Sequence, residues 1–170
     1  ATVTVIEDSR LLKINKNRLK TIIRRYPDIA EIVIRILCKR IEFNAEKVVE
    51  GLGLHYQTSK LAAGDCSAAM AKTYDLEVWI PSMQVYKEVS SVSNALDYQA
   101  RRGNIRFTRS ASSGSAKNKT EFVHTLNASG LATSRLIPAI LEQFQQEDGS
   151  VVVPKVLQKW VGKEVLKVKS

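Results

Sequence analysis

Tyr86-Lys-Glu-Val-Ser-Ser-Val-Ser-Asn94 is the stretch that most constrains the fold, because it has the alternation of a β-strand. Successive side chains of a strand point to opposite faces, so Glu88 and Ser90 are expected on one face. Val89 and Ser91 are then expected on the other. A face that carries a carboxylate and a hydroxyl is typical of either a solvated sheet edge or a polar cleft, and the residues alone leave both interpretations open.

The segments around this strand predict an antiparallel sheet with one substantial helix, which is an α+β fold. Strand-like alternation also occurs in the ranges 54–63, 74–81, 104–107 and 121–129. Helical segments are expected at 66–74 (a turn of small residues), at 97–103 and over Leu131–Gln146, where Pro138 is expected to introduce a kink. The range 109–119 predicts a flexible Ser/Gly/Lys loop, and Asp148-Gly149 predicts a turn.

Residues 1–50 have a different pattern, and the change near Gly51-Leu-Gly53 predicts two units, 1–50 and 54–170. Apolar runs at 1–5 and 11–14 predict a short hairpin, and 16–25 predicts a basic helix. A second helix is expected to begin at Pro27 and to carry an apolar stripe of Ile29, Ile32, Val33, Ile36, Leu37 and Ile41. Two short strands cannot cover this stripe, so it is expected to face a core or a second copy of the chain.

Composition predicts a soluble globular protein of the cytoplasm. The 170 residues include 26 Lys+Arg and 17 Asp+Glu, a formal net charge of +9, which weakly favours a polyanionic partner. No apolar run approaches the roughly 18 residues of a membrane span. The two cysteines cannot build a disulfide framework, and the two histidines lack the spacing of zinc ligands.

Four segments of the second unit have an order and spacing that resemble the C-terminal part of the catalytic domain of seryl-tRNA synthetases, a subgroup of the class II aminoacyl-tRNA synthetases. They are Tyr74-Asp-Leu-Glu-Val-Trp79, Tyr86–Asn94, Tyr98-Gln-Ala-Arg-Arg102 and His124-Thr-Leu-Asn-Ala-Ser-Gly-Leu-Ala-Thr-Ser-Arg135. The match runs from about His55 to about Gly162 and is more specific than any lone short motif. It implies part of a class II antiparallel sheet followed by the helix of motif 3.

The resemblance also implies a substrate site. The implied ATP-binding residues are Glu88, Val89, Ser90, Ser91 and Arg135, with Glu88 and Ser91 holding Mg²⁺; the implied serine-binding residues are Ser129 and Asn127. A carboxylate suits a hard cation that bridges phosphates, and the guanidinium of arginine can bond two phosphate oxygens at once. Taken alone, Ser129 would suit a helix N-cap and Arg135 an exposed position on a helix.

The implied activity is ATP-dependent activation of serine and its transfer to tRNA. The chain lacks motif 1 and the Arg-x-Glu strand of motif 2, so we expect half a site with no catalytic residue of its own. The alternative is a non-catalytic fusion or remnant that acts as a binding module. The stretch Arg101–Lys119 has six Lys+Arg and no acid, which indicates either tRNA backbone contact or a solvated loop. An exposed sheet edge predicts self-association.

The first unit resembles the C-terminal end of a cyclic-nucleotide-binding domain of the catabolite-activator type. The resemblance rests on ATVTVIEDSRLLKI (1–14) and RRYPDIAEIVIRIL (24–37). In that family a Gly-Glu…Arg cassette binds the ligand phosphate, and residues 1–50 contain no glycine. Regulation by a cyclic nucleotide is therefore the least favoured hypothesis.

Overall fold

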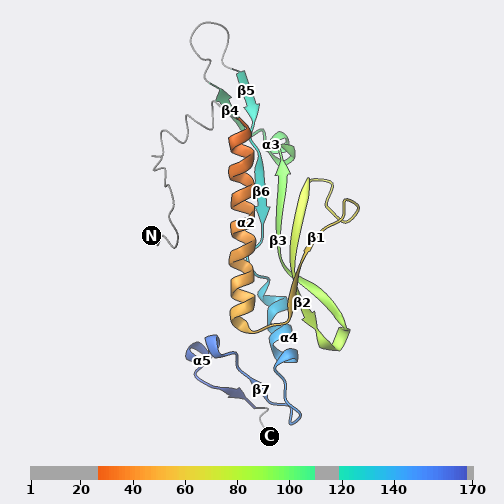
Figure 1. Cartoon of the computed structure of the whole chain (residues 1–170), viewed down its shortest axis with the longest axis vertical. Helices are drawn as coiled ribbons and strands as arrows, with labels where there is room; N and C mark the ends of the chain where they lie inside the picture. Colours follow the sequence, from red (N-terminus) through yellow and green to blue (C-terminus); the bar gives the residue numbers. More distant parts are fainter. Residues whose placement is uncertain (1–26, 110–118, 168–170) are drawn as a thin grey trace, which may run out of the picture.

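The computed structural model describes residues 27–109 and 119–167, in which one long helix lies beside a twisted sheet (Figure 1). The helices are α2 (Pro27–Leu52), the 3₁₀ turn η1 (Pro81–Met83), α3 (Tyr98–Gly103), α4 (Thr133–Gln143) and α5 (Lys155–Val161). The strands are β1 (Tyr56–Lys60), β2 (Lys72–Ile80), β3 (Val85–Leu96), β4 (Arg106–Arg109), β5 (Lys119–Phe122), β6 (Thr125–Ala128), β7 (Val151–Val152) and β8 (Val165–Leu166). None of the helices in these ranges has the length and hydropathy needed to cross a bilayer.

The main sheet has the strand order β1-β2-β3-β6, and every neighbouring pair is antiparallel. Strands β4 and β5 form a separate hairpin, and β7 pairs with β8. This arrangement confirms the predicted α+β fold. The range 121–129 contains the end of β5 and the whole of β6 rather than one strand, because the chain passes there from the hairpin to the main sheet.

The core lies on the face of the sheet that carries Leu76 and Val78. This face contacts the C-terminal half of α2 and one side of α4. Its fully buried side chains include Val49 of α2 and Val78 of β2, each with no exposed surface. Each such valine contributes about 1.5–3 kcal/mol of burial free energy, so α2 and α4 fix the position of the opposite, polar face.

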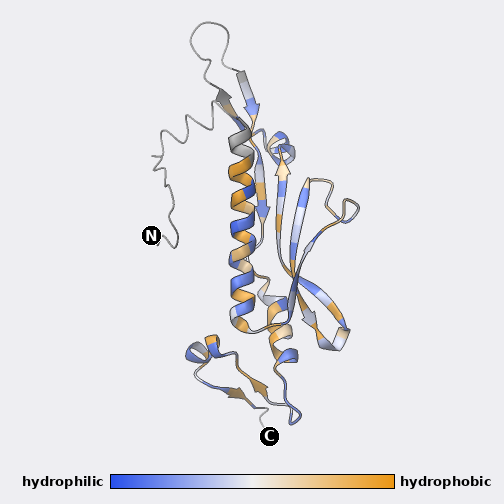
Figure 2. Cartoon of the chain, in the orientation of Figure 1, coloured by the Kyte–Doolittle hydropathy of each residue, from blue (hydrophilic) through white to orange (hydrophobic). Residues whose placement is uncertain are grey.

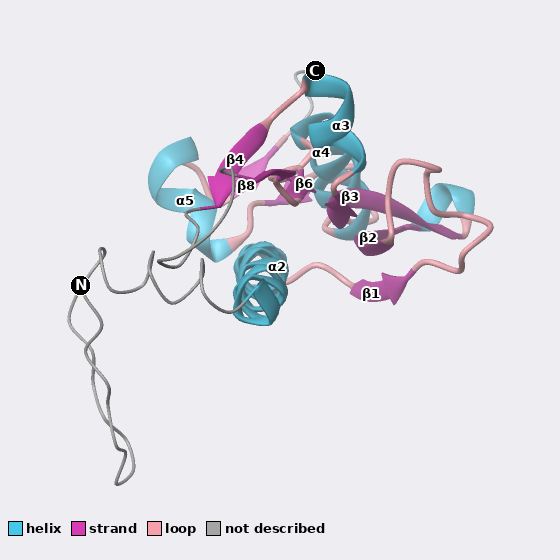
Figure 3. Cartoon of the chain, turned by 90° about the horizontal axis from the view of Figure 1, so that it is seen from above, coloured by secondary structure: helices cyan, strands magenta, loops and turns pink. Residues whose placement is uncertain are grey.

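The apolar stripe predicted on α2 does not face this core. Ile32 and Ile36 are 50% and 58% exposed, whereas Ala45, Val49 and Leu52 on another side of the helix are buried. Figure 2 shows apolar residues along α2, and Figure 3 shows the helix end-on beside the strands. The predicted helix is confirmed, but in the described part of the chain its buried surface lies in the last two turns.

Other predictions differ from the structure in detail. Residues 66–74 form turns that lead into β2 rather than a helical segment, since Lys72–Tyr74 pair with β3. The long helix is shorter than the predicted range, and α4 continues through Pro138. The predicted turn at Asp148-Gly149 is present, with Gly149 at φ 77°. The predicted hairpin at 1–14 and helix at 16–25 lie outside the described residues, as does most of the Ser/Gly/Lys loop.

A β-bulge interrupts the predicted alternation of β3. The register pairs Glu77 with Glu88 but Leu76 with Ser90, so Val89 is an extra residue in β3. Val89 and Ser90 are consecutive and both buried, at 0% and 1% exposed. The expectation that Glu88 and Ser91 lie on opposite faces is therefore wrong, because the bulge shifts the alternation by one residue.

Candidate functional site

The face of the sheet opposite α2 and α4 carries a row of polar side chains. Across β2 and β3, Asp75 pairs with Ser91 and Glu77 pairs with Glu88. Cross-strand partners point to the same side of a sheet, so all four share this face. The bulge is what places Glu88 and Ser91 together, although three positions separate them in sequence.

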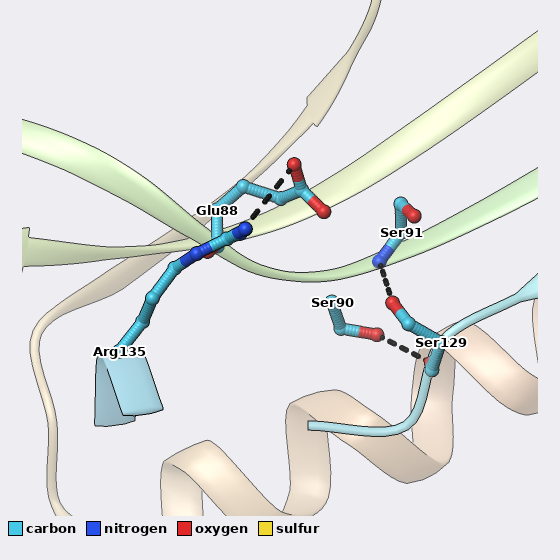
Figure 4. A network of polar contacts seen from close by, with 5 residues as sticks. All are labelled: Glu88, Ser90, Ser91, Ser129 and Arg135. Carbon is cyan, nitrogen blue, oxygen red and sulfur yellow. Dashed lines mark hydrogen bonds and ion pairs between the residues drawn. The ribbon is translucent and has the colours of Figure 1, made fainter. Parts of the chain in front are cut away.

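Ser129 holds the end of β6 against β3 by three hydrogen bonds, and Figure 4 shows those donated by Ser90 and Ser91. Its Oγ accepts from the backbone N–H of Ser91 at 2.9 Å, and its backbone N–H donates to the carbonyl oxygen of Ser91 at 3.0 Å. The hydroxyl of Ser90 donates to the carbonyl oxygen of Ser129 at 3.0 Å. The N-cap of α4 is Ala132, so Ser129 is not a helix cap. The implied serine-binding residue is thus fixed beside the implied ATP-binding strand.

Arg135 extends from the first turn of α4 back to β3. Its Nη1 donates to the backbone carbonyl oxygen of Glu88 at 2.6 Å and lies 3.7 Å from Oε2 of the same residue. The two side chains are 52% and 41% exposed, so this ion pair contributes about 0–1 kcal/mol to stability. Because solvent reaches both groups, each remains accessible to a ligand phosphate or cation.

The remaining implied residues take different positions. The side chain of Val89 is buried in the core, and its carbonyl oxygen accepts from Ala132 N–H at 2.7 Å. The backbone of this residue is therefore already used to join β3 to α4. Asn127 pairs with Ser93, which places it on the polar face, and it is exposed. Within the described ranges its side chain is not part of the network around Ser129.

Two acidic residues of this face were missed by the sequence reasoning. Asp75 is only 8% exposed, and its Oδ1 has no hydrogen-bond partner in the described part of the chain. Burial, followed by the nearby charges of Glu88 and Glu77, raises the pKa of Asp75 to about 6. Glu77 accepts a hydrogen bond from Gln57 Nε2 at 2.7 Å. The alternation of Tyr74–Trp79 could have revealed both, since it places two carboxylates on one face.

An aromatic cluster borders the polar face at the end of β2. The rings of Trp79 and Tyr86 meet edge-to-face with centroids 5.1 Å apart, and Tyr86 Oη lies 2.9 Å from Nε2 of His55. Gln143 of α4 donates to the carbonyl oxygen of Trp79 at 2.7 Å. These contacts give the site one rigid, partly apolar wall.

The residues present fit a magnesium ion that is shared with phosphates. The described ranges contain no cluster of three or more His, Cys, Asp or Glu side chains suited to a metal. Glu88 and Ser91 offer one carboxylate and one hydroxyl on the same face, and Mg²⁺ commonly takes one or two protein oxygens and completes its shell with phosphate and water. The donor set therefore suits a metal that arrives with a nucleotide rather than a resident one.

Comparison with known proteins shows the family of this chain. The family model of the tRNA synthetase class II core domain (G, H, P, S and T) matches residues 31–144, more than half of the chain. Serine–tRNA ligase 2 of Clostridium acetobutylicum is 71% identical over 122 residues, covering 72% of this chain and 28% of that protein. The serine–tRNA ligase of Elusimicrobium minutum is 50% identical over 131 residues, covering 77% and 30%. The chain thus spans under a third of the length of these curated relatives.

Solved structures show the same likeness. A crystal structure of seryl-tRNA synthetase from Pyrococcus horikoshii complexed with ATP has a TM-score of 0.68 and 42% identity, over 78% of this chain and 29% of that one. The cytoplasmic serine–tRNA ligase from Naegleria fowleri in complex with AMP has a TM-score of 0.69 and 35% identity, over 81% and 32%. Both neighbours were solved with an adenine nucleotide.

Proposed function

Because the chain belongs to the family of the tRNA synthetase class II core domain, we propose that its polar face is the ATP- and serine-binding half of a serine–tRNA ligase site. One observation carries this proposal. The bulge at Val89 and the three hydrogen bonds of Ser129 gather Glu88, Ser91, Ser129 and Arg135 around the middle of β3. Residues that are distant in sequence thus converge on one strand, which supports a shared binding site.

The charged residues would receive the nucleotide. Arg135 can turn its guanidinium from the carbonyl of Glu88 to the phosphate tail of ATP, and it does so without losing charge. Glu88 and Ser91 would hold Mg²⁺, which when bound would neutralise phosphate charge. The carboxylate of Glu88 is half-exposed and only weakly paired with Arg135, so little interaction free energy would be lost when the cation replaces Arg135.

Ser129 would position the amino acid. Its Oγ accepts a hydrogen bond from Ser91, which fixes the oxygen and leaves the hydroxyl proton available to donate. Asn127 lies two residues earlier on β6 and would present its amide from the same face. A small polar substrate such as serine matches these short hydrogen-bonding side chains better than an apolar amino acid does.

Serine activation needs more than these residues. The carboxylate of serine attacks the α-phosphorus of ATP and pyrophosphate leaves, so charge builds on the α-phosphate. The resemblance implies that an arginine of an Arg-x-Glu strand stabilises that charge. In this sequence the Arg-x-Glu triplet is Arg40-Ile-Glu42, which lies in helix α2. We infer that the chain binds the substrates but does not activate serine alone. The tRNA substrate and a cytoplasmic location follow from the same proposal.

Binding and exchange measurements test this function together. Calorimetric titration of the whole chain with ATP and Mg²⁺ should show binding that weakens about tenfold or more in Arg135→Ala, since a charge-assisted phosphate contact contributes about 1.5–3 kcal/mol. Arg101→Ala, on α3, is the matched control and should leave the affinity unchanged. Serine-dependent ATP–pyrophosphate exchange should be undetectable. Equal ATP affinity in Arg135→Ala, or robust exchange by the chain alone, would contradict the corresponding part of the proposal.

A further inference from the structure

A cavity lies on the side of the sheet away from the candidate site, between β2, β3 and the middle of α2. Its volume is ≈ 410 Å³, within the range of small-molecule sites. The residues that matter to its chemistry are Arg35, Cys38, Lys39, Lys72, Tyr74 and Asn94. No residue of this cavity belongs to the candidate site described above.

The sheet itself separates this cavity from the ATP- and serine-binding face. Tyr74 and Val92 line the cavity and pair with each other across β2 and β3. Their neighbours Asp75 and Ser91 also pair, and alternation points them to the opposite face. A ligand in the cavity therefore cannot be the nucleotide bound at Glu88 and Arg135.

Two lysines bring positive charge to the cavity. In the ranges that the structure describes, neither Lys39 nor Lys72 takes part in an ion pair. The Nζ of Lys72 lies 4.6 Å from the centroid of the Tyr74 ring, which holds the ammonium group near the cavity wall. Like charges gathered in one hollow repel one another, and an anion between them removes that repulsion.

The nearest acidic group only partly offsets this charge. Glu42 lines the adjoining hollow beside Lys39, and its pKa is raised by burial and then by Glu46, while Lys39 and Lys72 oppose the rise. Two lysines line the cavity beside this one carboxyl, so the balance at the cavity mouth stays positive.

We propose that the cavity lined by Lys39 and Lys72 binds a phosphate group, carried either by a phosphorylated small molecule or by the backbone of an RNA strand. The two ammonium groups supply charge-assisted donors, and the amide of Asn94 adds a neutral one. The Tyr74 ring gives an apolar wall for the part of the ligand next to the phosphate. This site is additional to the proposed ATP and serine site and does not depend on it.

Cys38 provides a direct report on the cavity. It is half-buried and lines the cavity, whereas Cys66 is also half-buried but lies outside it, so one chain contains both probe and internal control. Burial and then the charge of Glu42 raise the pKa of the Cys38 thiol, so alkylation by iodoacetamide is best followed at about pH 9, where more thiolate forms. We expect pyrophosphate or a short single-stranded RNA to slow alkylation of Cys38 several-fold and to leave the rate at Cys66 unchanged.

The choice of ligand then shows where the phosphate comes from, and variants show which residues bind it. Protection of Cys38 by pyrophosphate indicates a phosphorylated small molecule, and protection by RNA alone indicates backbone phosphates. The double variant Lys39→Gln/Lys72→Gln should weaken the protecting ligand about tenfold or more, because two charge-assisted contacts are lost. Lys155→Gln/Lys159→Gln on α5 removes the same charge elsewhere and should not.

Three results would overturn the proposal: no protection of Cys38 by either ligand, equal protection of Cys66, or an equal loss in the two double variants. Arg135→Ala distinguishes the two sites. This variant should lose ATP affinity yet retain protection of Cys38. The experiment on this cavity can therefore be interpreted even if the ATP and serine proposal fails.

Discussion

Replacing Asp75 by Asn should stabilise the protein at neutral pH and have little effect in acid. Asp75 is buried on the polar face, where Glu77 and Glu88 share its side of the sheet, and these surroundings raise its pKa to about 6. An unfolded chain would ionise this carboxyl near about pH 3.9. Between these two values the folded protein binds the proton more tightly, so stability falls as pH rises through this window.

The magnitude follows from the same two values. A rise from about 3.9 to about 6 corresponds to about 3 kcal/mol lost from the free energy of unfolding above pH 6. Part of the rise comes from Glu88, whose side chain is 41% exposed and therefore screened by water. We expect Asp75→Asn to gain about 1–3 kcal/mol at about pH 7.5 and almost nothing at about pH 4.

Urea unfolding followed by tryptophan fluorescence across this pH range measures the difference. Glu147→Gln is the control, because Glu147 is exposed, and its difference from the parent chain should be small at every pH. A gain for Asp75→Asn that does not change with pH would show that charge is not its cause. A loss of stability at neutral pH would show that the ionised carboxylate is favourably bound in the folded protein, which would refute the reasoning.

Three further outcomes follow from the structure. Val49→Ala should lower the free energy of unfolding by about 1–3 kcal/mol, because this side chain of α2 is fully buried against the sheet. Chemical denaturation measures the difference. Val48 is half-exposed on the same helix, so the control variant Val48→Ala should lower the free energy of unfolding far less. Ser129→Ala should lower the free energy of unfolding by about 1 kcal/mol, because the N–H of Ser91 loses its side-chain acceptor. The same variant should weaken serine affinity, which calorimetry with serine measures. Unchanged serine binding would show that Ser129 is not part of the serine pocket. Strand β6 lies at the edge of the main sheet, so light scattering should detect self-association that grows with concentration, and a strictly monomeric chain at high concentration would contradict this.

The strands of the main sheet and the long helix were predictable, because their patterns are strong and local. Alternation in Tyr74–Trp79 and Tyr86–Asn94 places β2 and β3, and the apolar periodicity after Pro27 places α2. The burial of α2 was not predictable, since periodicity shows that a face is apolar but not what covers it. Ala45, Val49 and Leu52 are buried because the sheet lies beside them.

The candidate site was predictable as a set of residues but not as a geometry. The resemblance supplies Glu88, Ser91, Ser129 and Arg135, and the structure brings these four together. A bulge depends on the register between two strands, so no pattern within one strand reveals it. The alternation of Tyr74–Trp79 places Asp75 on the polar face, but its burial depends on neighbours from other strands and could not be predicted.

The bulge at Val89 also has a genetic consequence. In a regular strand, residues three positions apart face opposite sides, and the single extra residue here reverses that relation for Glu88 and Ser91. Deleting the codon for residue 89 would remove the bulge and leave Glu88 and Ser91 two positions apart, so a regular strand would still point both side chains to one face. A scan of single-codon deletions along β3 should therefore find that removal of residue 89 lowers stability, because a buried valine is lost, but harms ligand binding less than removal of residue 88 or 91 does.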